Sequence, residues 1–339
     1  MKILIGISGG VDSTYAALKL MEEGHTVVGA VLEMHAHTDT DAATAAAERL
    51  GIPLVKIDCT FAFENIIKTY FVDEYAKGRT PNPCILCNPE VKFRFLADYA
   101  RANGFDKIAT GHYARIIEKD GRFAVARAKD GTKDQTYMLY RLPQDILEIL
   151  MFPLADCIKQ DVKEIAAARG IIEADVKESQ EICFIPDNDY RSFVEDRLGK
   201  FPEGNFVSED GKILGTHRGI ISYTVGQRKG LGISLGQRVF VSRIDPATNE
   251  ITLSDPDKTT ACFEASSLVY SGISKLAVGH SFRANVKIRY RATPTSATVT
   301  AIADDKVLIE IDNPVGLVAP GQSVVVYDGD RVLLGGFID

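Results

Sequence analysis

A glycine-rich loop near the start of the chain has the composition of a phosphate-binding site. Gly6–Ser13 reads Gly-Ile-Ser-Gly-Gly-Val-Asp-Ser and joins a short apolar run, Ile3–Ile7, to a stretch with helical spacing. Adjacent glycines let backbone N–H groups approach a ligand, and the following helix offers unpaired N–H groups and a positive dipole end. Ser8 and Ser13 add hydroxyl donors, and Asp12 is placed to hold a magnesium ion bound to phosphates. The alternative is an ordinary glycine turn.

Two cysteines lie in the most unusual stretch, Thr80–Asn88, which reads Thr-Pro-Asn-Pro-Cys-Ile-Leu-Cys-Asn. Its prolines fix an extended backbone path. Cys87 stands just before a helix expected to start near Glu90, and the dipole of that helix would stabilise the thiolate as a nucleophile. Cys84 and Cys87 are also compatible with half of a zinc site, a redox pair or two buried thiols.

A third cysteine, Cys183, lies far along the chain in Ser-Gln-Glu-Ile-Cys-Phe-Ile-Pro. Taken alone it would be assigned to core packing. Together with Cys87 it forms a pair that is distant in sequence, which is the arrangement that thiol exchange or sulfur relay requires.

Two basic segments in the second half of the chain suit a phosphate backbone. Lys287, Arg289 and Arg291 alternate within an expected strand, so they would share one face. The alternative is a solvated barrel strand. Glycines of Gly226–Gly232 bracket a second candidate group, made of Gln227, Arg228 and Lys229, in a flexible loop that can place cations against a nucleic acid.

The first half of the chain alternates strand and helix, which predicts a mostly parallel sheet with helices on both faces. The expected strands are Ile3–Ile7, Thr26–Leu32, Leu54–Ile57 and Lys107–Thr110. The expected helices are about Ser13–Glu23, Ala42–Leu50, Phe61–Tyr75, Glu90–Asn103 and Val162–Arg169.

After about Asp187 glycines and short β-branched runs recur, which predicts antiparallel barrel or sandwich structure. The expected strands are Gly219–Thr224, Arg238–Ile244, Ile251–Leu253, Phe282–Arg291, Ala297–Ile302, Val307–Ile311, Ser323–Tyr327 and Val332–Phe337. A softer break near Ser254–Asp257 separates a small middle domain from the rest. We therefore predict domains at residues 1–187, 188–256 and 257–339.

The composition is typical of a globular protein without membrane segments. Hydrophobic residues make up 45% of the chain and charged residues 25%, and no apolar run approaches the thickness of a bilayer. The first residues are too soon interrupted by glycines for a signal peptide, and six cysteines are too few for a disulfide scaffold. We expect a cytoplasmic protein. The net charge of −7 argues mildly against extensive nucleic-acid coverage but permits a local basic face.

The order of these motifs resembles that of the tRNA-specific 2-thiouridylase family, within the pyrophosphate-loop ATP pyrophosphatases, along nearly the whole chain. The Ser-Gly-Gly-Val-Asp-Ser string resembles the pyrophosphate loop, and the Gly-Lys-Ser/Thr of a Walker loop is missing from the sequence. The other segments that carry the resemblance are Gly78–Asn88, Ala109–Tyr113, Lys133–Tyr137, Ile182–Ile185, Thr224–Gly232, Arg289–Arg291 and Ala319–Gln322.

The resemblance implies an adenine nucleotide α-hydrolase-like α/β domain, a small β-rich middle domain and a C-terminal β-barrel, the latter two contacting tRNA. It implies ATP contacts by Gly6, Ile7, Ser8, Gly9, Gly10, Val11, Asp12 and Ser13, with Leu32 and Gly111 near the adenosine. It places Asn82, Pro83 and Cys84 against the target base. It implies tRNA contacts by His112, Lys133, Asp134, Gln135, Arg289, Tyr290 and Gln322.

The activity that the resemblance implies is ATP-dependent 2-thiolation of the wobble uridine in tRNAs of the lysine, glutamate and glutamine type. ATP, with Mg²⁺, would adenylate the C2 oxygen. Cys87 would be the nucleophile and Cys183 would carry a persulfide, received from a cysteine desulfurase or a sulfur-relay protein. We expect a monomer that acts on tRNA and contacts no membrane.

One position departs from the pattern, because many family members carry an aspartate where this chain has Cys84. The acid–base assignment therefore stays open, and Cys84, Cys87 and Cys183 are candidate ligands for a 4Fe–4S cluster with one open iron. Three rival functions also stay open at this point. They are an amide-forming ligase with the same loop, a non-catalytic nucleotide- and RNA-binding module, and a structural zinc or iron–sulfur protein.

Overall fold

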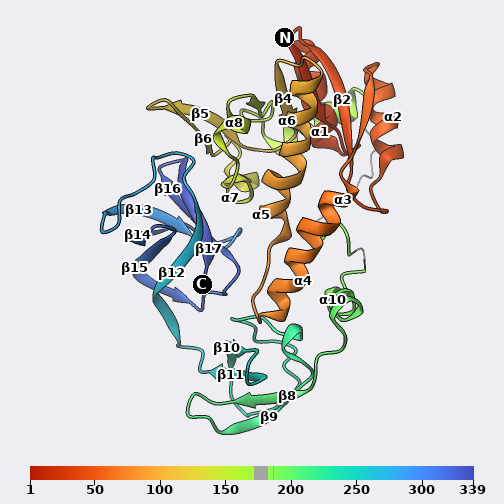
Figure 1. Ribbon diagram of the computed structural model, residues 1–339. Helices are drawn as coiled ribbons and strands as arrows, with labels where there is room; N and C mark the ends of the chain where they lie inside the picture. The colour runs from red at the N-terminus through yellow and green to blue at the C-terminus, as the bar shows by residue number, and fades with distance from the viewer. Residues whose placement is uncertain (172–181, 186) are drawn as a thin grey trace.

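The computed structural model describes residues 1–171, 182–185 and 187–339 (Figure 1). An α/β domain is followed by a small β-rich domain and a six-stranded barrel, which confirms the predicted fold class. In the described part of the chain, the helices are too short or too polar to span a bilayer.

The first domain is built on a five-stranded parallel sheet with the order β3-β2-β1-β4-β7. Its strands are β1 Lys2–Gly6, β2 Thr26–Glu33, β3 Leu54–Asp58, β4 Lys107–Thr110 and β7 Leu150–Met151. Successive residues of β1 enter two cores, Leu4 on one face and Ile3 and Ile5 on the other. The sheet is therefore covered on both faces, and Gly6 lies at the middle of its carboxyl edge, beside Thr110.

Three helices cover the face of Ile3 and Ile5: α1 Val11–Glu22, α2 Thr40–Leu50 and α9 Lys159–Ala168. The other face carries two long helical stretches. The first consists of α3 Thr60–Ala62, η1 Phe63–Lys68 and α4 Thr69–Ala76, and the second of α5 Pro83–Cys87, η2 Asn88–Lys92 and α6 Phe93–Ala102. Both middle segments, η1 and η2, are π-helical, a form that often marks functional sites.

The helix with the two cysteines starts earlier than the sequence predicted. Pro83 takes the first helical position after Asn82, a place where the missing N–H of proline costs nothing. Cys87 and Lys92 both keep helical backbone angles, so α5, η2 and α6 form one stretch. The expectation that Cys87 precedes a helix starting near Glu90 is wrong.

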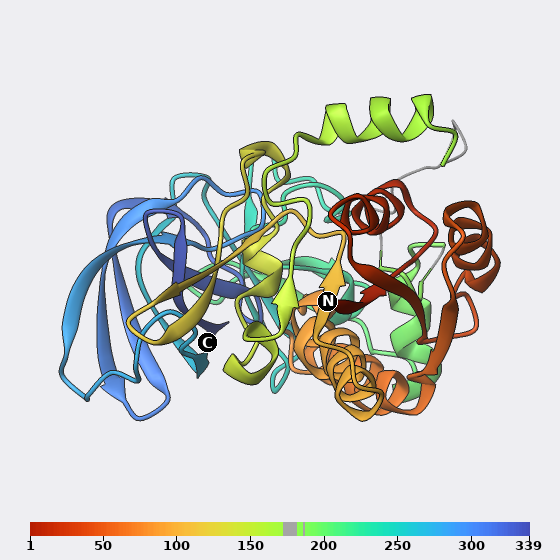
Figure 2. The ribbon, with the colours of Figure 1, turned by 90° about the horizontal axis from the view of Figure 1, so that it is seen from above.

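A hairpin absent from the sequence prediction links the first domain to the barrel. Strands β5 Arg115–Lys119 and β6 Arg122–Ala126 are joined by Asp120 and Gly121, both with positive φ. Asp-Gly is a favoured pair for such a turn, so the signal was present in the sequence. Ala126 pairs with Arg331 of the last barrel strand, and Figure 2 shows the hairpin reaching the barrel.

The second half consists of a four-stranded sheet and a closed barrel, with strand β12 pairing both β15 and β17 to close the latter. The middle sheet comprises β8 Gly204–Val207, β9 Ile213–His217, β10 Phe240–Asp245 and β11 Glu250–Ser254. The barrel comprises β12 Thr259–Val269, β13 Ser281–Lys287, β14 Thr295–Ala303, β15 Lys306–Gly316, β16 Ser323–Asp328 and β17 Arg331–Ile338. The remaining helices are η3 Gly131–Lys133, α7 Thr136–Leu139, α8 Gln144–Leu147, α10 Tyr190–Leu198 and η4 Ile220–Ser222.

One expected strand is wrong, and another ends earlier than predicted. Gly219–Thr224 contains the short 3-10 helix η4, because Gly219 adopts a φ of +99° and starts a turn. Strand β13 ends at Lys287 rather than Arg291, so Lys287, Arg289 and Arg291 do not alternate along one strand. The predicted common face for these three cations therefore does not exist.

Candidate functional site

The phosphate loop is fixed by hydrogen bonds between its own residues. Ser13 Oγ accepts from Ser8 N at 3.2 Å and donates to the Gly10 carbonyl at 3.1 Å. Gly9 has a φ of +78°, and a Cβ atom there would lie 2.6 Å from Ala42 of α2. Helix α1 then begins after Gly10, which gives no side-chain hydrogen bond to the first turn. The first N–H groups of α1 therefore suit an anion such as a phosphate.

Asp12 in this loop is held by a buried lysine. Lys159 Nζ lies 2.6 Å from both carboxylate oxygens of Asp12, and the Tyr113 hydroxyl donates to Asp12 Oδ1 at 2.9 Å. The Lys159 side chain is 8% exposed and that of Asp12 is 33% exposed. Burial and the charge of Asp12 raise the pKa of Tyr113 well above its ordinary value, so it stays a hydrogen-bond donor. The carboxylate expected to approach Mg²⁺ thus already has a cationic partner.

Gly111 lies where the end of β4 meets the phosphate loop. A Cβ atom on Gly111 would lie 2.6 Å from Asp12 C and Ser13 N, so only glycine allows this approach. Leu32, near the end of β2, packs its partly buried side chain against the core on the α6 face. Both residues expected near the adenosine therefore lie at the carboxyl edge of the sheet, the edge at which open α/β sheets bind ligands.

The three candidate cysteines are free thiols in different surroundings: Cys84 and Cys183 are exposed, whereas Cys87 is buried. Burial raises the pKa of the Cys87 thiol to about 12, Lys92 opposes this, and Cys84 and Cys183 reinforce it. Although Cys183 is exposed as a residue, partial desolvation of its sulfur raises the pKa of its thiol, and Lys92 again opposes the shift. Cys87 therefore lacks the activation expected from a helix dipole, and the charge of Lys92 opposes only part of the effect of burial.

Lys92 interacts electrostatically with all three thiols, and sequence reasoning missed it. It ends η2, five residues after Cys87, and its charge opposes the rise in the pKa of the Cys87 thiol. Burial lowers the pKa of Lys92, but Cys87, Cys84 and Cys183 act against this, and the net shift is upward. Little in the sequence indicated a role for Lys92, because a lysine in a helical pattern normally occupies a solvent-exposed position.

His112 connects the cysteine helix with the phosphate loop. It follows Gly111 directly, its Nδ1 lies 2.8 Å from Thr110 Oγ1, and its ring lies 5.6 Å from that of Phe93. Burial, and then the charge of Lys92, lower the pKa of His112 to about 3, so the ring is neutral. These contacts are those of a satisfied, half-buried histidine, and contact with tRNA stays a prediction.

The segment before the cysteine helix is attached to the barrel. Thr80 N donates to the Pro320 carbonyl at 2.8 Å, and Gln322 Nε2 donates to the Thr80 carbonyl at 2.8 Å. Arg79 also reaches the Ile338 carbonyl at 2.9 Å. Gln322, expected to contact tRNA, therefore also positions the Asn82-Pro83-Cys84 segment. The Asn82 amide itself contacts Met138 Sδ at 3.5 Å.

The Lys133–Gln135 segment lies at the junction of the first domain and the barrel. Asp134 is buried, with Lys287 Nζ at 3.7 Å and Arg127 Nε at 3.9 Å from its carboxylate. Gln135 accepts from Tyr113 N at 2.7 Å. Asp134 and Gln135 thus hold structure together here, while the tRNA contacts expected of them stay predictions.

The two other candidate tRNA segments meet each other between the middle domain and the barrel. Arg289 hydrogen-bonds the Leu317 carbonyl, and its Nη2 lies 3.3 Å from where a Cβ of Gly226 would be. Gln227 Nε2 donates to the Lys229 carbonyl at 2.9 Å, which closes the loop on itself. Arg228 and Lys229 are exposed, and Tyr290 is half-buried under Lys287 Nζ, 5.6 Å from its ring.

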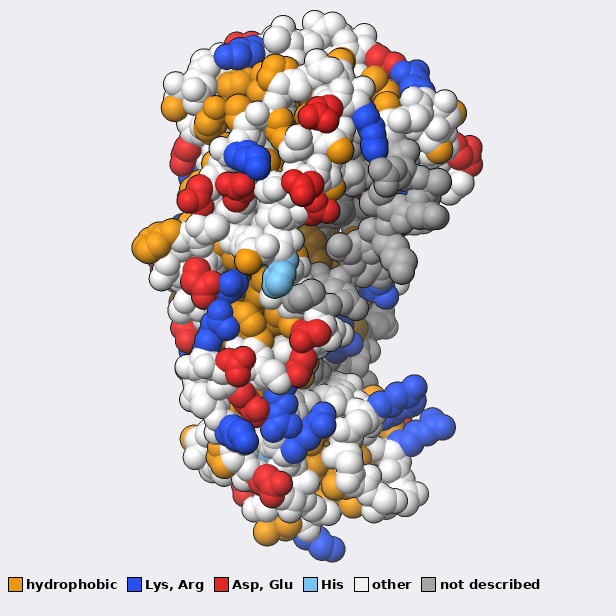
Figure 3. All heavy atoms as spheres, turned by 90° about the vertical axis from the view of Figure 1, so that its right-hand side faces the viewer, with side chains coloured by type: hydrophobic (Ala, Val, Ile, Leu, Met, Phe, Trp, Pro, Cys, Tyr) orange, Lys and Arg blue, Asp and Glu red, His pale blue; other side chains and the backbone are white. Residues whose placement is uncertain are grey.

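The distribution of charge over the surface favours nucleic-acid binding more than the net charge of the chain indicates. On the face drawn in Figure 3, acidic side chains are spread widely, whereas Lys and Arg side chains gather toward its lower part. That part corresponds to the middle domain of Figure 1. A chain of net charge −7 therefore still presents basic areas.

The side chains present fit a magnesium ion better than an iron–sulfur cluster. Asp12 keeps part of its carboxylate open, so it suits a magnesium ion that is otherwise held by ATP phosphates. Among residues 1–171, 182–185 and 187–339, no three His, Cys, Asp or Glu side chains converge in a geometry that could hold a metal ion. Cys84, Cys87 and Cys183 as arranged here therefore do not form a cluster site.

Three family models together match most of the chain. Residues 1–187 match a tRNA methyl transferase HUP domain, residues 191–255 a tRNA methyl transferase PRC-barrel domain, and residues 260–338 an aminomethyltransferase beta-barrel domain. A solved 4-thiouridine synthetase–RNA complex with bound ATP shares 16% identity, at a TM-score of 0.37 over 57% of this chain and 50% of that one. That likeness is too weak to bear on the chemistry.

Curated relatives match over the full length. The tRNA-specific 2-thiouridylase of Carboxydothermus hydrogenoformans is 41% identical, covering 100% of this chain and 97% of that protein. That of Acetivibrio thermocellus is 42% identical, covering 99% of both. With the phosphate loop, the cysteine helix and the three-domain order all present, this chain belongs to the tRNA-specific 2-thiouridylase family.

Proposed function

We propose that this protein uses ATP to replace the C2 oxygen of the tRNA wobble uridine with sulfur. One observation carries the proposal: Cys87 and Cys183, far apart in sequence, both interact electrostatically with Lys92, the last residue of the π-helical segment that follows Cys87. A sulfur relay requires such a pair, and an amide-forming ligase with the same loop does not. The family relationship supports the same reaction.

The phosphate loop would bind ATP at the carboxyl edge of the sheet. Amides of Gly9, Gly10 and the first turn of α1 would hold the phosphates, and Lys159 would share its charge between Asp12 and the departing pyrophosphate. Mg²⁺, when bound with ATP through Asp12, would supply further neutralisation of phosphate charge.

A flipped-out uridine would lie beside Asn82, Pro83 and Cys84, because the C2 oxygen is hard to reach inside a stacked anticodon. This oxygen attacks the α-phosphorus of ATP, pyrophosphate leaves, and the C2–O bond becomes the bond to a good leaving group, AMP. The Thr80 contacts with the barrel would fix the position of this segment during the step.

Sulfur would arrive as a persulfide on Cys183, delivered by a cysteine desulfurase or relay protein to this exposed thiol. The terminal persulfide sulfur attacks C2 and AMP leaves with its oxygen. The Cys87 thiolate then attacks Cys183 Sγ, which breaks the persulfide S–S bond and leaves the sulfur on the base. The resulting Cys87–Cys183 disulfide requires a dithiol reductant before the next turnover.

The test separates the two half-reactions in Cys183→Ser. This variant is expected to release pyrophosphate from ATP in the presence of unmodified tRNA but to form no thiolated tRNA. Normal thiolation by Cys183→Ser with a persulfide donor would show that the relay is wrong. Iron analysis of anaerobically purified protein addresses the cluster mechanism, and stoichiometric iron lost in Cys84→Ser would favour it.

A further inference from the structure

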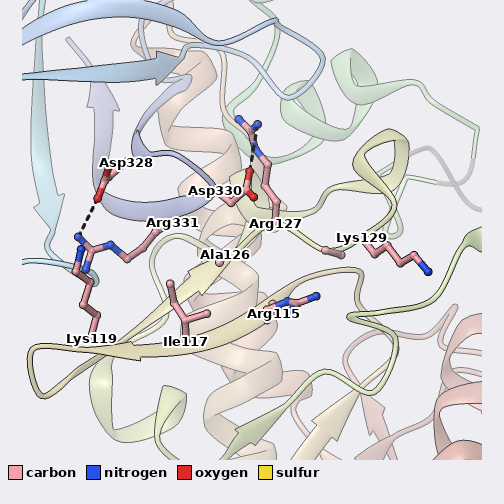
Figure 4. Close-up of a pocket in the computed structure, with 10 residues that line it drawn as sticks. Arg115, Ile117, Lys119, Ala126, Arg127, Lys129, Asp328, Asp330 and Arg331 are labelled. Carbon is pink, nitrogen blue, oxygen red and sulfur yellow. Dashed lines mark hydrogen bonds and ion pairs between the residues drawn. The ribbon is translucent and has the colours of Figure 1, made fainter.

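A basic groove lies at the junction of the β5–β6 hairpin and the turn between β16 and β17. It encloses about 610 Å³ and is lined by five cations, Arg115, Lys119, Arg127, Lys129 and Arg331, against two carboxylates, Asp328 and Asp330 (Figure 4). The remaining lining residues are Ile117, Ala126 and Ala128. In a chain of net charge −7, such an excess of positive charge within one groove favours an anionic ligand.

Part of this charge has no protein partner. Arg331 pairs with Asp328 at 3.3 Å, Arg115 pairs with Asp156, and Arg127 has Asp330 at 3.8 Å. Lys119 and Lys129 are exposed and form no ion pair with the described residues. In the described structure, Arg127 Nε is buried and lacks a hydrogen-bond partner, but it has Asp134 as an ion-pair partner at 3.9 Å. The two exposed lysines therefore supply the positive charge of the groove that is unpaired among the described residues.

The lining selects among anionic ligands. Among the residues that the structure describes, no aromatic ring lines the groove, so it offers no stacking surface for a base or a nucleotide. Lysine and arginine side chains without base-reading contacts are typical of attachment to a phosphate backbone.

We propose that this groove binds the sugar–phosphate backbone of tRNA away from the modified base, and so sets the position of the tRNA without reading its sequence. This inference rests on the proposed function, because it takes tRNA as the substrate. The hairpin explains why the first domain reaches across to the barrel: each contributes one wall of the groove.

The test measures binding of unmodified tRNA at several salt concentrations to the full chain and to Lys119→Ala and Lys129→Ala. Each substitution removes an exposed cation without an ion-pair partner among the described residues, so folding should be unaffected. We expect each to weaken binding roughly 3–10-fold at low salt and to lower the slope of log K against log salt by about one. At saturating tRNA, kcat for thiolation should be unchanged while KM for tRNA rises.

Lys2→Ala is the matched control. Lys2 is also exposed but lies at the amino end of β1, the edge opposite Gly6, and its removal should leave tRNA affinity unchanged. If Lys119→Ala and Lys129→Ala both bind tRNA with the affinity and salt slope of the wild type, the groove is not an RNA site. If they instead lose only inhibition by added pyrophosphate, the groove binds a free phosphate compound and the assignment to tRNA is wrong.

The two proposals fail separately. Wild-type protein that binds tRNA through this groove but never thiolates it would contradict the proposed function and leave the groove assignment intact. Wild-type protein that thiolates tRNA while both lysine variants behave like Lys2→Ala would contradict the groove assignment alone.

Discussion

Lys159 Nζ lies 2.6 Å from both carboxylate oxygens of Asp12, which joins the first residue of α9 to the phosphate loop. Within this ion pair the Lys159 side chain is buried, whereas the Asp12 side chain is partly exposed. A cation at the start of a helix opposes the helix dipole, so its position there needs a reason. Holding Asp12 and then a phosphate group supplies that reason.

Lys159→Met is therefore expected to reduce tRNA-dependent pyrophosphate release roughly 100-fold, because both Asp12 and the phosphates lose their buried counter-charge. The matched control is Lys163→Met, which removes an exposed lysine from the same helix and should keep wild-type activity. Pyrophosphate release at wild-type rate and ATP affinity by Lys159→Met would contradict the role given to this lysine.

The thiols should differ in their reaction with iodoacetamide. Burial raises the pKa of Cys87 to about 12, so at pH 8 only about 1 in 10⁴ of its thiols is ionised. Exposed Cys84 and Cys183 are expected to react first, and labelling of Cys87 should rise about tenfold per pH unit as the pH approaches its pKa. Peptide mass spectrometry gives each rate; preferential labelling of Cys87 at pH 7 would be inconsistent with this structure.

Lys92 should control sulfur transfer rather than adenylation. Lys92→Met removes the charge that most strongly opposes the effect of burial, so the pKa of Cys87 rises and the thiolation rate at neutral pH falls. The rising limb of the thiolation pH profile should move to higher pH, while pyrophosphate release is retained. Lys92→Arg, which keeps the charge, should restore part of the rate. An unmoved pH profile in Lys92→Met would assign this lysine to structure alone.

Replacing buried Asp134 should lower the free energy of unfolding more than replacing exposed Asp330. Asp134→Ala leaves Lys287 and Arg127 without their buried carboxylate, and we expect a loss of about 1–3 kcal/mol in the free energy of unfolding. Asp330→Ala removes a 74% exposed partner of the same Arg127 and should cause no measurable change. Equal denaturation midpoints for the two variants would show that the buried carboxylate of Asp134 does not stabilise the fold.

Local sequence patterns predict an element well when the signal lies within the residues of that element. The strands Thr26–Glu33 and Lys107–Thr110 and the loop Gly6–Ser13 follow from apolar runs and glycines alone. The Asp120–Gly121 turn also carries a local hairpin signal, although the hairpin is missing from the strands expected above.

The errors and omissions depend on contacts between distant residues. Neither Lys92 nor Lys159 stands in a motif, and each gains its role from partners that folding brings close. Strand β13 ends at Lys287, whose side chain is buried beside Asp134, and the alternation of charged residues could not show this contact.

The most direct test of the proposed sulfur transfer is thiolation of unmodified tRNA with ATP, Mg²⁺ and a persulfide donor, comparing wild type with Cys87→Ser. Thiolated tRNA is detected by its retardation in a mercury-containing gel. We predict a retarded band that requires ATP with the wild type and is absent with Cys87→Ser. A band of equal intensity with Cys87→Ser, or no band from wild-type protein under aerobic and anaerobic, cluster-reconstituted conditions alike, would contradict the proposal.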